Sequence, residues 1–591
     1  MNSETKICQN CKEEFIIESE DSNFYKKINV PPPTWCPECR MIRRFMIRNE
    51  RSLYGGNCDN CGKRVISMYH SGKEFPVYCN ECWWGDSWEG TVYGREYDFS
   101  KPFFEQFREL YKKVPHAALI ATQNLDSPYA GFTYKSKNVY LSASVIGSEN
   151  ILYSWAADQS FSCTDCYEVA NSELCYWGQN IERCYRTAFL IHANECMDSQ
   201  YLFDCSNCKN CFLSSNLRSK QYVFQNVQYS KDEYMEKVKP YQYGRWEKQR
   251  EALEKFKEII LGSVHRYARV LRSVNATGDN IYNAKNVHSS FDVYDVEDVK
   301  YAFRSFSEKD SMDVFGAGPN SNHSYECVST GIQGSMEKFS AYIWENISNV
   351  EYSVFCHSVS RAFACIGLRN KQYCILNKQY SKEEYEELVP RIVEHMNSMP
   401  YVDKQGRTYK YGEFFPPNLS PFAYNETIAQ EYYPLTKEQT KQQGYRWKDP
   451  EERKYEVTMT TGQIPDYIKD VKDDILNQII ECSHRQQCNE QCTKAFKIIQ
   501  DELAFYRNLN LPLPRLCPNC RHYQRLKQRN PLKLWHRTCN CSGATSENKA
   551  YNNSTEHFHG NNFCPIEFET SYAPERPEIV YCEQCYQQEV V

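Results

Sequence analysis

Residues 29–50 read NVPPPTWCPECRMIRRFMIRNE and place Cys36 and Cys39 on a proline-rich turn directly before a run of arginines. Nearly the same text returns as NLPLPRLCPNCRHYQRLKQRNP, residues 510–531. Sliding the sequence on itself by 481 residues aligns positions 15–58 with 496–539 and gives 16 identities in 44 positions. Composition alone predicts roughly two or three. The two ends of the chain are therefore copies of one design.

The N-terminal copy carries two sets of paired C-x2-C turns, and the gap between the pairs is longer in the first set than in the second. Zn2+ takes four thiolates in a tetrahedron, and each C-x2-C turn brings two sulfurs to one ion. The spacing predicts two closed zinc sites that leave no position for a substrate. Their ligands are Cys8, Cys11, Cys36 and Cys39, and then Cys58, Cys61, Cys79 and Cys82.

The C-terminal copy has looser spacing but predicts two further sites, so that we expect four Zn2+ ions in all. The predicted ligands are Cys488, Cys492, Cys517 and Cys520 for the third ion, and Cys539, Cys541, Cys582 and Cys585 for the fourth. Cys482 and His484 compete with Cys488 for the third site. About forty residues separate the halves of the fourth site, and Cys564, His557 or His559 from that stretch can supply a ligand.

Two segments resemble the bacterial "probable zinc-ribbon" domain family, and the whole arrangement resembles large multi-ribbon proteins of bacteria. The two segments are CQNCKEEF…NFYKKINVPPPTWCPECRMIRR and CNEQCTKAF…AFYRNLNLPLPRLCPNCRHYQR, covering about residues 6–50 and 486–530. The shared pattern is C-x2-C-x3-F, a central F-Y and P-x-x-C-x2-C-R-x-x-R. The resemblance implies structural zinc ribbons. One departure is that members tend to place glycine after the second cysteine, where this chain has Lys12 and Thr493.

Basic residues at helical spacing follow each second C-x2-C turn. On a helix they share one face and can pair with phosphates of DNA, RNA or a ribonucleoprotein. The alternatives are a solvated helix face, or arginines that pair with acids of the chain itself. The candidate nucleic-acid contacts are Arg40, Arg43, Arg44, Arg48, Arg521, Arg525, Lys527 and Arg529.

The middle of the chain contains a second duplication. Residues 212–238 align with 363–389 with 15 identities in 27 positions, and each copy passes from a strand pattern into a helix that begins with a capping box. Upstream of the first copy, Cys163, Cys184 and Cys205 follow one another at a 21-residue step. A fixed step together with short strands predicts a right-handed parallel β-helix with stacked interior side chains.

The cysteines of this central region allow two interpretations. They can fill interior ladders of the solenoid as small apolar residues, or Cys205, Cys208 and Cys211 can join Cys163 and Cys166 in a metal or iron–sulfur site. The fixed register accounts for most of them as packing. We therefore favour the ladder.

The predicted fold is mainly β with helices: zinc ribbons at both ends flank a duplicated right-handed parallel β-helix, or solenoid, with helical caps. The predicted domains are ribbons at 1–57 and 58–95, a first solenoid unit at 125–228, a helical cap at 229–275, a second solenoid unit at 276–380, a cap at 381–400, a linker at 401–470, and ribbons at 471–538 and 539–591.

Composition restricts the function. A mean hydropathy of −0.71 and the lack of a long apolar run argue against a membrane span, and the N-terminus shows no export-signal pattern, so we expect a cytoplasmic protein. In that reducing compartment, clustered cysteines among the 30 favour metal binding over disulfides. A net charge of −6 confines nucleic-acid binding to local patches. The sequence favours a non-catalytic scaffold whose ribbons contact nucleic acid or a ribonucleoprotein. The alternatives are a protein-interaction scaffold with structural zinc, and a β-helix enzyme acting on carbohydrate or nucleic acid.

Overall fold

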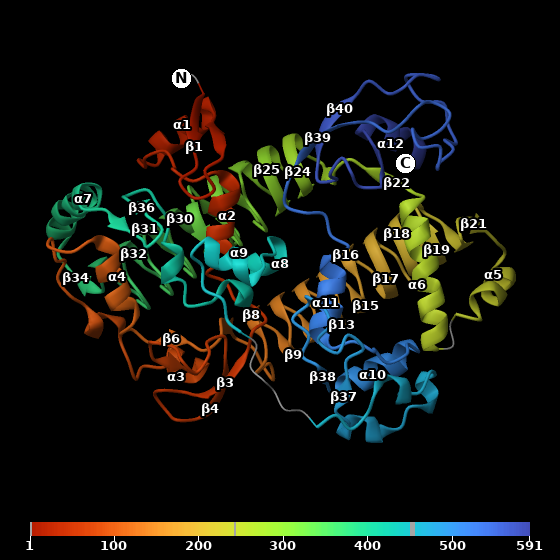
Figure 1. The fold of residues 1–591 in the computed structure, drawn as a ribbon, viewed down its shortest axis with the longest axis horizontal. Helices are drawn as coiled ribbons and strands as arrows, with labels where there is room; N and C mark the ends of the chain where they lie inside the picture. Colours follow the sequence, from red (N-terminus) through yellow and green to blue (C-terminus); the bar gives the residue numbers. More distant parts are fainter. Residues whose placement is uncertain (1–2, 242–243, 450–455) are drawn as a thin grey trace. The chain divides into compact units, whose positions relative to one another are not determined.

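The computed structural model describes residues 3–241, 244–449 and 456–591 (Figure 1). The chain divides into two compact units, each built on one parallel β-solenoid. Unit 1 comprises residues 1–119, 268–449 and 532–534, and unit 2 comprises 120–267, 450–531 and 535–591. The predicted fold class is confirmed. The order of the segments in the sequence does not show which ribbons belong with which solenoid. In the structure the N-terminal ribbons share a unit with the second solenoid, and the C-terminal ribbons share a unit with the first.

The solenoid of unit 2 contains 15 described strands in one parallel system that closes with an antiparallel hairpin. The strands are β7 Ala121–Thr122, β8 Gly131–Tyr134, β9 Lys137–Tyr140, β10 Ala143–Ile146, β11 Glu149–Leu152, β12 Trp155–Asp158, β13 Phe161–Thr164, β14 Tyr167–Ala170, β15 Glu173–Tyr176, β16 Gln179–Glu182, β17 Tyr185–Asn194, β18 Gln200–Ser206, β19 Lys209–Ser215, β20 Gln221–Phe224 and β21 Val227–Gln228.

The length of one coil follows from the strand register, in which Trp155 pairs with Tyr167 and Tyr167 with Gln179. Between Phe132 and Gln225 every third residue has a positive φ, so a coil has four sides of three residues each. The predicted 21-residue step is therefore wrong as the length of a coil. It still placed cysteines on the inside, because that step is a whole number of three-residue sides.

Interior side chains form hydrogen-bonded ladders. Ser142 Oγ donates to the carbonyl oxygens of Tyr140 and Ile151 and accepts the backbone N–H of Ser154, one coil further on. Cysteines take the same position: Cys163 Sγ donates to the carbonyls of Phe161 and Ser172. Small side chains that satisfy corner carbonyls suit this narrow interior, which is the packing role that the sequence favours for these cysteines.

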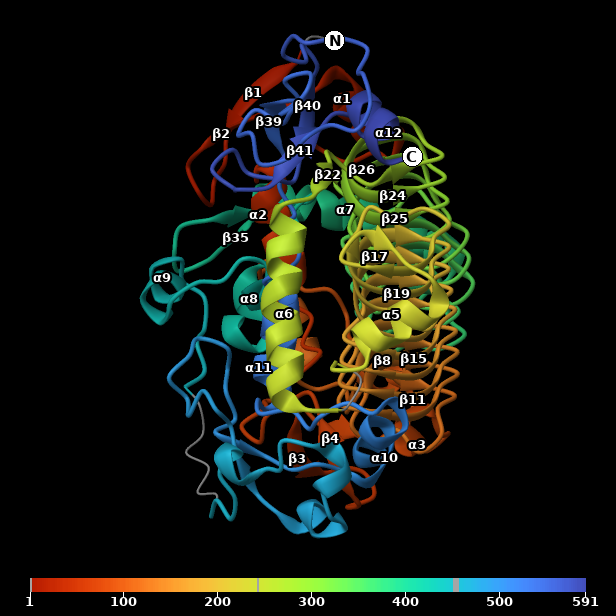
Figure 2. The ribbon, with the colours of Figure 1, turned by 90° about the vertical axis from the view of Figure 1, so that its right-hand side faces the viewer.

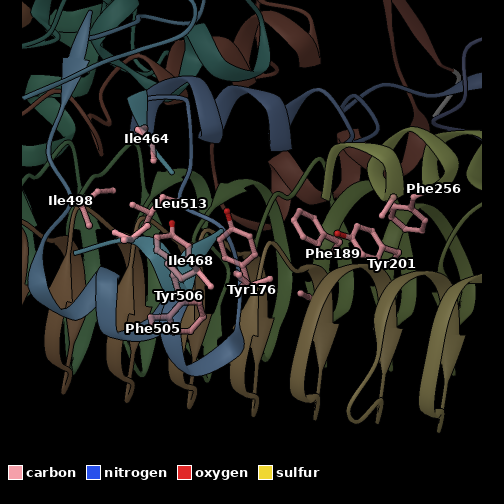
Figure 3. Packing of buried hydrophobic residues seen from close by; sticks show 14 of the residues in the cluster. Tyr176, Phe189, Tyr201, Phe256, Ile464, Ile468, Ile498, Phe505, Tyr506 and Leu513 are labelled. Carbon is pink, nitrogen blue, oxygen red and sulfur yellow. The ribbon is translucent and has the colours of Figure 1, made fainter. Parts of the chain in front are cut away.

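The outer side of the unit 2 solenoid is covered at β18 and β19 by α6 (Trp246–Leu261), which follows α5 (Lys231–Val238) (Figure 2). The predicted capping box is present, because Ser230 accepts from the backbone N–H of Glu233 while the Glu233 carboxylate accepts from Ser230. Aromatic rings on the outside of the coils form the core of this packing. The ring of Phe189 stacks on that of Tyr201 with 4.8 Å between their centroids, and the ring centroid of Phe256 of α6 lies 5.9 Å from that of Tyr201 (Figure 3).

The solenoid of unit 1 contains 12 described strands, and its coils are less regular in length. The length of a coil varies by one residue in either direction. Paired residues are 11 apart at Val274 and Lys285, 12 apart at Ser348 and Ser360, and 13 apart at Glu308 and Ser321. The strands are β23 Val270–Leu271, β24 Val274–Tyr282, β25 Lys285–Tyr294, β26 Glu297–Lys300, β27 Glu308–Phe315, β28 Ser321–Asn322, β29 Tyr325–Val328, β30 Gly334–Lys338, β31 Ile347–Glu351, β32 Ser360–Phe363, β33 Gln372–Ile375 and β34 Lys378–Gln379.

Among the buried carboxyl groups of the unit 1 solenoid are those of Glu308 and Glu337. Burial raises the pKa of Glu308 to about 7. It raises the pKa of Glu337 to about 8, with a smaller contribution from the charge of Glu308. Ionisation of these groups inside the fold is therefore disfavoured.

The segment predicted as a linker, 401–470, is largely folded. It follows the cap helix α7 (Lys382–Ser398), which begins at the predicted Ser381–Glu384 capping box. Residues 401–449 belong to unit 1 and residues 456–470 to unit 2, and residues 450–455 of the predicted linker lie outside the described residues. Their described elements are β35 Tyr401–Val402, β36 Thr408–Tyr409, η2 Pro417–Leu419, η3 Tyr424–Glu426, α8 Ile428–Tyr432, α9 Lys437–Gln442, η4 Thr461–Gln463 and η5 Ile468–Asp470. Buried aromatic residues, among them Tyr409, Phe414 and Tyr424, pack this segment, as its aromatic-rich sequence predicts.

The ribbons consist of short hairpins and short helices. In unit 1 they comprise β1 Glu4–Ile7, β2 Glu14–Ile17, α1 Ser19–Lys27, α2 Pro37–Phe45, β3 Tyr54–Asn57, β4 Arg64–Ser67, β5 Val77–Tyr78, α3 Asn80–Trp84, η1 Gly90–Tyr93, α4 Phe103–Tyr111 and β6 His116–Ala117. In unit 2 they comprise η6 Asp473–Asn477, β37 Ile480–Glu481, β38 Ala495–Phe496, α10 Gln500–Leu509, α11 Pro518–Leu526, β39 Trp535–Thr538, β40 Glu567–Thr570, β41 Ile579–Tyr581 and α12 Glu583–Val590, with β22 (Val264–Arg266) pairing β41. Among the helices described, none is long and apolar enough to cross a bilayer.

Candidate metal centres

The two N-terminal sets of cysteines converge as the spacing predicts. Cys8, Cys11, Cys36 and Cys39 form one group and Cys58, Cys61, Cys79 and Cys82 another, with the sulfur atoms of each group within 4.8 Å of one another. Two thiolates on one tetrahedral ion lie about 3.8 Å apart. The Cys11–Cys36 and Cys61–Cys79 Sγ distances are 3.7 and 3.8 Å. Each group can hold one metal ion.

Local backbone geometry explains the first site. Cys8 follows the end of β1, Cys36 is the N-cap of α2, and the Cys36 backbone N–H donates to Cys8 Sγ at 3.2 Å. Lys12, which replaces the glycine common in zinc-ribbon knuckles, adopts a left-handed φ of 68°. That conformation costs a non-glycine residue roughly 1 kcal/mol. The knuckle therefore forms with a lysine, at some cost in stability.

The third site differs from the prediction in one ligand. Its four-sulfur group is Cys482, Cys492, Cys517 and Cys520, so Cys482 stands where the spacing predicted Cys488. The reason is the hairpin: Cys482 directly follows β37, as Cys8 follows β1, and the Cys517 N–H donates to Cys482 Sγ at 3.2 Å. Cys488 lies in the loop between the hairpin strands, with its Sγ 3.8 Å from that of Cys520.

The fourth site also departs from the prediction, because Cys564 takes the place expected for Cys541. The group is Cys539, Cys564, Cys582 and Cys585. Cys541 instead joins His557, His559 and Cys585 in a neighbouring group. Cys564 lies far from the other ligands in sequence and has no C-x2-C partner, so spacing alone does not distinguish it from the alternatives His557 and His559.

In three of these groups at least one thiol has a lowered pKa while a neighbouring thiol has a raised one, because protonated sulfurs donate hydrogen bonds to a thiolate. Hydrogen bonds from Cys36 and Cys39 hold the pKa of Cys8 far below its usual range. In the third group, a hydrogen bond from Cys482 contributes most to lowering the pKa of Cys492 to about 6. In the fourth, Cys539 does the same for Cys582, whose pKa falls to about 2.

The arginines predicted to contact phosphates face inward in unit 1. Arg40 Nη2 lies 2.8 Å from Asp313 Oδ2, and Arg44 Nη1 lies 3.0 Å from Asp313 Oδ1. All three side chains are at most 1 % exposed. Asp313 occupies a left-handed corner of the solenoid, at φ 59°. A single solenoid carboxylate therefore binds two arginines of the ribbon helix α2.

Unit 2 repeats this arrangement with the duplicated residues. Arg521 Nη1 lies 3.0 Å from Asp165 Oδ2, and Arg525 Nη1 lies 2.6 Å from Asp165 Oδ1. Asp165 is fully buried at a corner with φ 56°. Arg521 also pairs with Glu502, which accepts a hydrogen bond from Tyr153. The same Arg-x3-Arg pair therefore grips one corner aspartate in each unit.

The remaining predicted nucleic-acid contacts are distributed differently. Arg43 is buried between Glu326 and Glu413, at 2.8 Å from each. Arg48 is buried and pairs with Glu50. Arg529 is half-buried, and Lys527 is exposed and pairs with Glu490. The exposed arginine face expected from the sequence is thus absent from the described residues, and pairing with the chain's own acids, the alternative interpretation, accounts for it.

No protein-family model matches the chain, and none of the curated proteins shows significant sequence similarity to it. The resemblance to zinc ribbons therefore rests on the residues that carry it and stays a prediction.

Proposed function

We propose that the protein is a non-catalytic scaffold in which Zn2+ ions stiffen the ribbons and buried ion pairs fasten each pair of ribbons to a solenoid. Zinc is the metal of choice because tetrathiolate groups with sulfur–sulfur distances near 3.8 Å suit its tetrahedral coordination. Four protein ligands per ion leave no open position, which is typical of structural sites.

The observation that carries the proposal is the use of the duplicated arginines. Arg40 and Arg44 on Asp313, and Arg521 and Arg525 on Asp165, are consumed by intramolecular pairing. Buried arginines cannot form the counterion-releasing contacts on which nucleic-acid affinity depends. The acids that converge here are likewise occupied by arginines, which argues against their use as catalytic carboxylates.

The solenoid of unit 2 offers a surface for a protein partner. One column of residues that pair from coil to coil contains three partly exposed apolar side chains. They are Phe161, Tyr185 and Met197, which are 42 %, 39 % and 41 % exposed. Exposed aromatic and methionine side chains are enriched at protein interfaces. We therefore favour a protein over a nucleic acid as the ligand of the scaffold.

The test combines binding and capture by the full-length protein. We expect the purified protein to show no salt-dependent binding to DNA or RNA, and captured partners to survive nuclease treatment. Replacing Tyr185 and Met197 by glutamate should abolish capture, whereas Gln221→Glu, at the end of the same column, should not. Nuclease-sensitive capture, or nucleic-acid binding whose affinity falls steeply with salt, would refute the proposal in favour of a nucleic-acid scaffold.

A further inference from the structure

The C-terminal ribbon contains more metal-ligating side chains than one tetrahedral ion takes. Two groups of four donors share a single residue, Cys585. In each group the donor atoms lie within 4.8 Å of one another. We propose that this ribbon holds two Zn2+ ions bridged by the Cys585 thiolate. One ion is bound by Cys539, Cys564, Cys582 and Cys585, and the other by Cys541, His557, His559 and Cys585.

The orientation of His557 indicates a metal ligand. Its Nε2 faces the Glu589 carboxylate at 3.3 Å, and both side chains are fully buried. A carboxylate only accepts hydrogen bonds, so Nε2 carries the proton. In the neutral ring Nδ1 is then a bare lone pair, and it lies 3.0 Å from Cys541 Sγ. If Cys541 is a thiol, its S–H can donate to this lone pair; if Cys541 is ionised, the contact is repulsive unless a cation binds both atoms.

His559 repeats this arrangement through its other nitrogen. Its Nδ1 donates to the carbonyl oxygen of Asn562 at 2.7 Å, which leaves the Nε2 lone pair 3.3 Å from Cys585 Sγ. Ligating histidines usually donate their second N–H to a carboxylate or a backbone carbonyl, which fixes the tautomer and the ring orientation. The two rings show one partner of each kind.

Charge compensation favours the second ion. The two groups together contain five cysteines, all buried. One Zn2+ on four thiolates leaves excess negative charge beside Cys541, and buried charge is costly unless it is paired. A second Zn2+ neutralises two further charges, and a thiolate has lone pairs enough to bind both ions. The shared position of Cys585 at the N-terminal end of α12 is therefore explained by bridging.

The competing explanation is that both contacts are hydrogen bonds with sulfur. That requires the Cys541 thiol to donate to His557 Nδ1. It also requires His559 to be doubly protonated, because its Nδ1 already faces an acceptor and Cys585 is a thiolate of the first group. In that case the ribbon binds one ion, and the histidines can be removed without loss of metal.

The test is a zinc count on the full-length protein by native mass spectrometry. We expect His559→Ala to bind one zinc ion fewer than the wild type. His536→Ala, an exposed histidine that pairs with Glu567 and Glu569 in the same ribbon, should lose none. X-ray absorption of the wild type should show a zinc–zinc distance of about 3.5–4 Å.

The two measurements fail independently. Retention of all zinc by His559→Ala would overturn the dinuclear site. If that variant loses more than one ion because the ribbon unfolds, the wild-type spectrum decides: a zinc–zinc signal supports the bridge, and its absence refutes it.

Discussion

Replacing Asp165 by asparagine tests the attachment of the third ribbon to its solenoid. The substitution preserves shape, and asparagine tolerates the left-handed φ of 56° at least as well as aspartate. It leaves Arg521, which is 2 % exposed, with its second partner Glu502, and it removes the carboxylate that pairs with Arg525, which is 1 % exposed. Removing one partner of a buried ion pair typically costs about 3–5 kcal/mol. The remaining amide oxygen can still accept one hydrogen bond, so we expect about 3 kcal/mol.

The loss should be local, because the arginines lie on α11 and the aspartate on the solenoid. A cost of about 3 kcal/mol corresponds to roughly a 100-fold lower protection of α11 against hydrogen exchange. The measurement is hydrogen–deuterium exchange of the full-length variant. Asp126→Asn is the matched control, since Asp126 occupies an exposed left-handed corner of the same solenoid. Equal protection of α11 in the two variants would refute the argument that Asp165 holds this helix.

The described geometry makes three further predictions. Asp313→Asn should lower the protection of α2 by less than Asp165→Asn lowers that of α11, because Glu326 also pairs with the unit 1 arginines; the same exchange experiment compares them. Cys482→Ser should cost the protein one zinc ion in native mass spectra, whereas Cys488→Ser should cost none. Glu337→Gln should stabilise unit 1 at pH 9, by on the order of 4 kcal/mol in urea unfolding, and have little effect at pH 4.

The sign of the last prediction follows from the raised pKa of Glu337, about 8 in the folded protein against 4.5 for an ordinary glutamate. The stability that its protonated form contributes is fully present below pH 4.5 and is lost as the pH rises through 8. Glutamine avoids this loss because it does not ionise. Exposed Glu105→Gln serves as the control, and an equal effect at pH 4 and pH 9 would contradict the argument.

The proposed outcomes for the metal variants depend on ligand identity alone. Loss of zinc from Cys488→Ser, with retention by Cys482→Ser, would reverse the assignment of the third group.

A greater loss of hydrogen-exchange protection in Asp313→Asn than in Asp165→Asn would mean that Glu326 does not compensate for the missing carboxylate in unit 1.

The sequence by itself determined features that depend on residues close together in the chain. The C-x2-C turns of Cys8 and Cys11 or Cys36 and Cys39 converge as their spacing requires, since a knuckle is set by a few backbone dihedrals. The capping box at Ser230 is equally local. The solenoid was recognisable from a repeated step between cysteines, although the backbone repeats every three residues. A clearer sign of that three-residue repeat is also in the sequence. Between Phe132 and Gln225, no position with a left-handed φ holds valine, isoleucine or threonine, which that conformation disfavours.

Only the tertiary structure decided what the arginines do and which ligands complete the C-terminal sites. Arg525 and Asp165 are separated by 360 residues, and a helix face rich in arginine reads the same whether it meets a phosphate or a carboxylate. Cys564 and Cys585 likewise meet through the folding of an irregular loop, which spacing rules do not describe. The physical reason is the same in both cases: a charged or ligating side chain is specified by the partner that replaces its water, and that partner comes from a distant part of the chain.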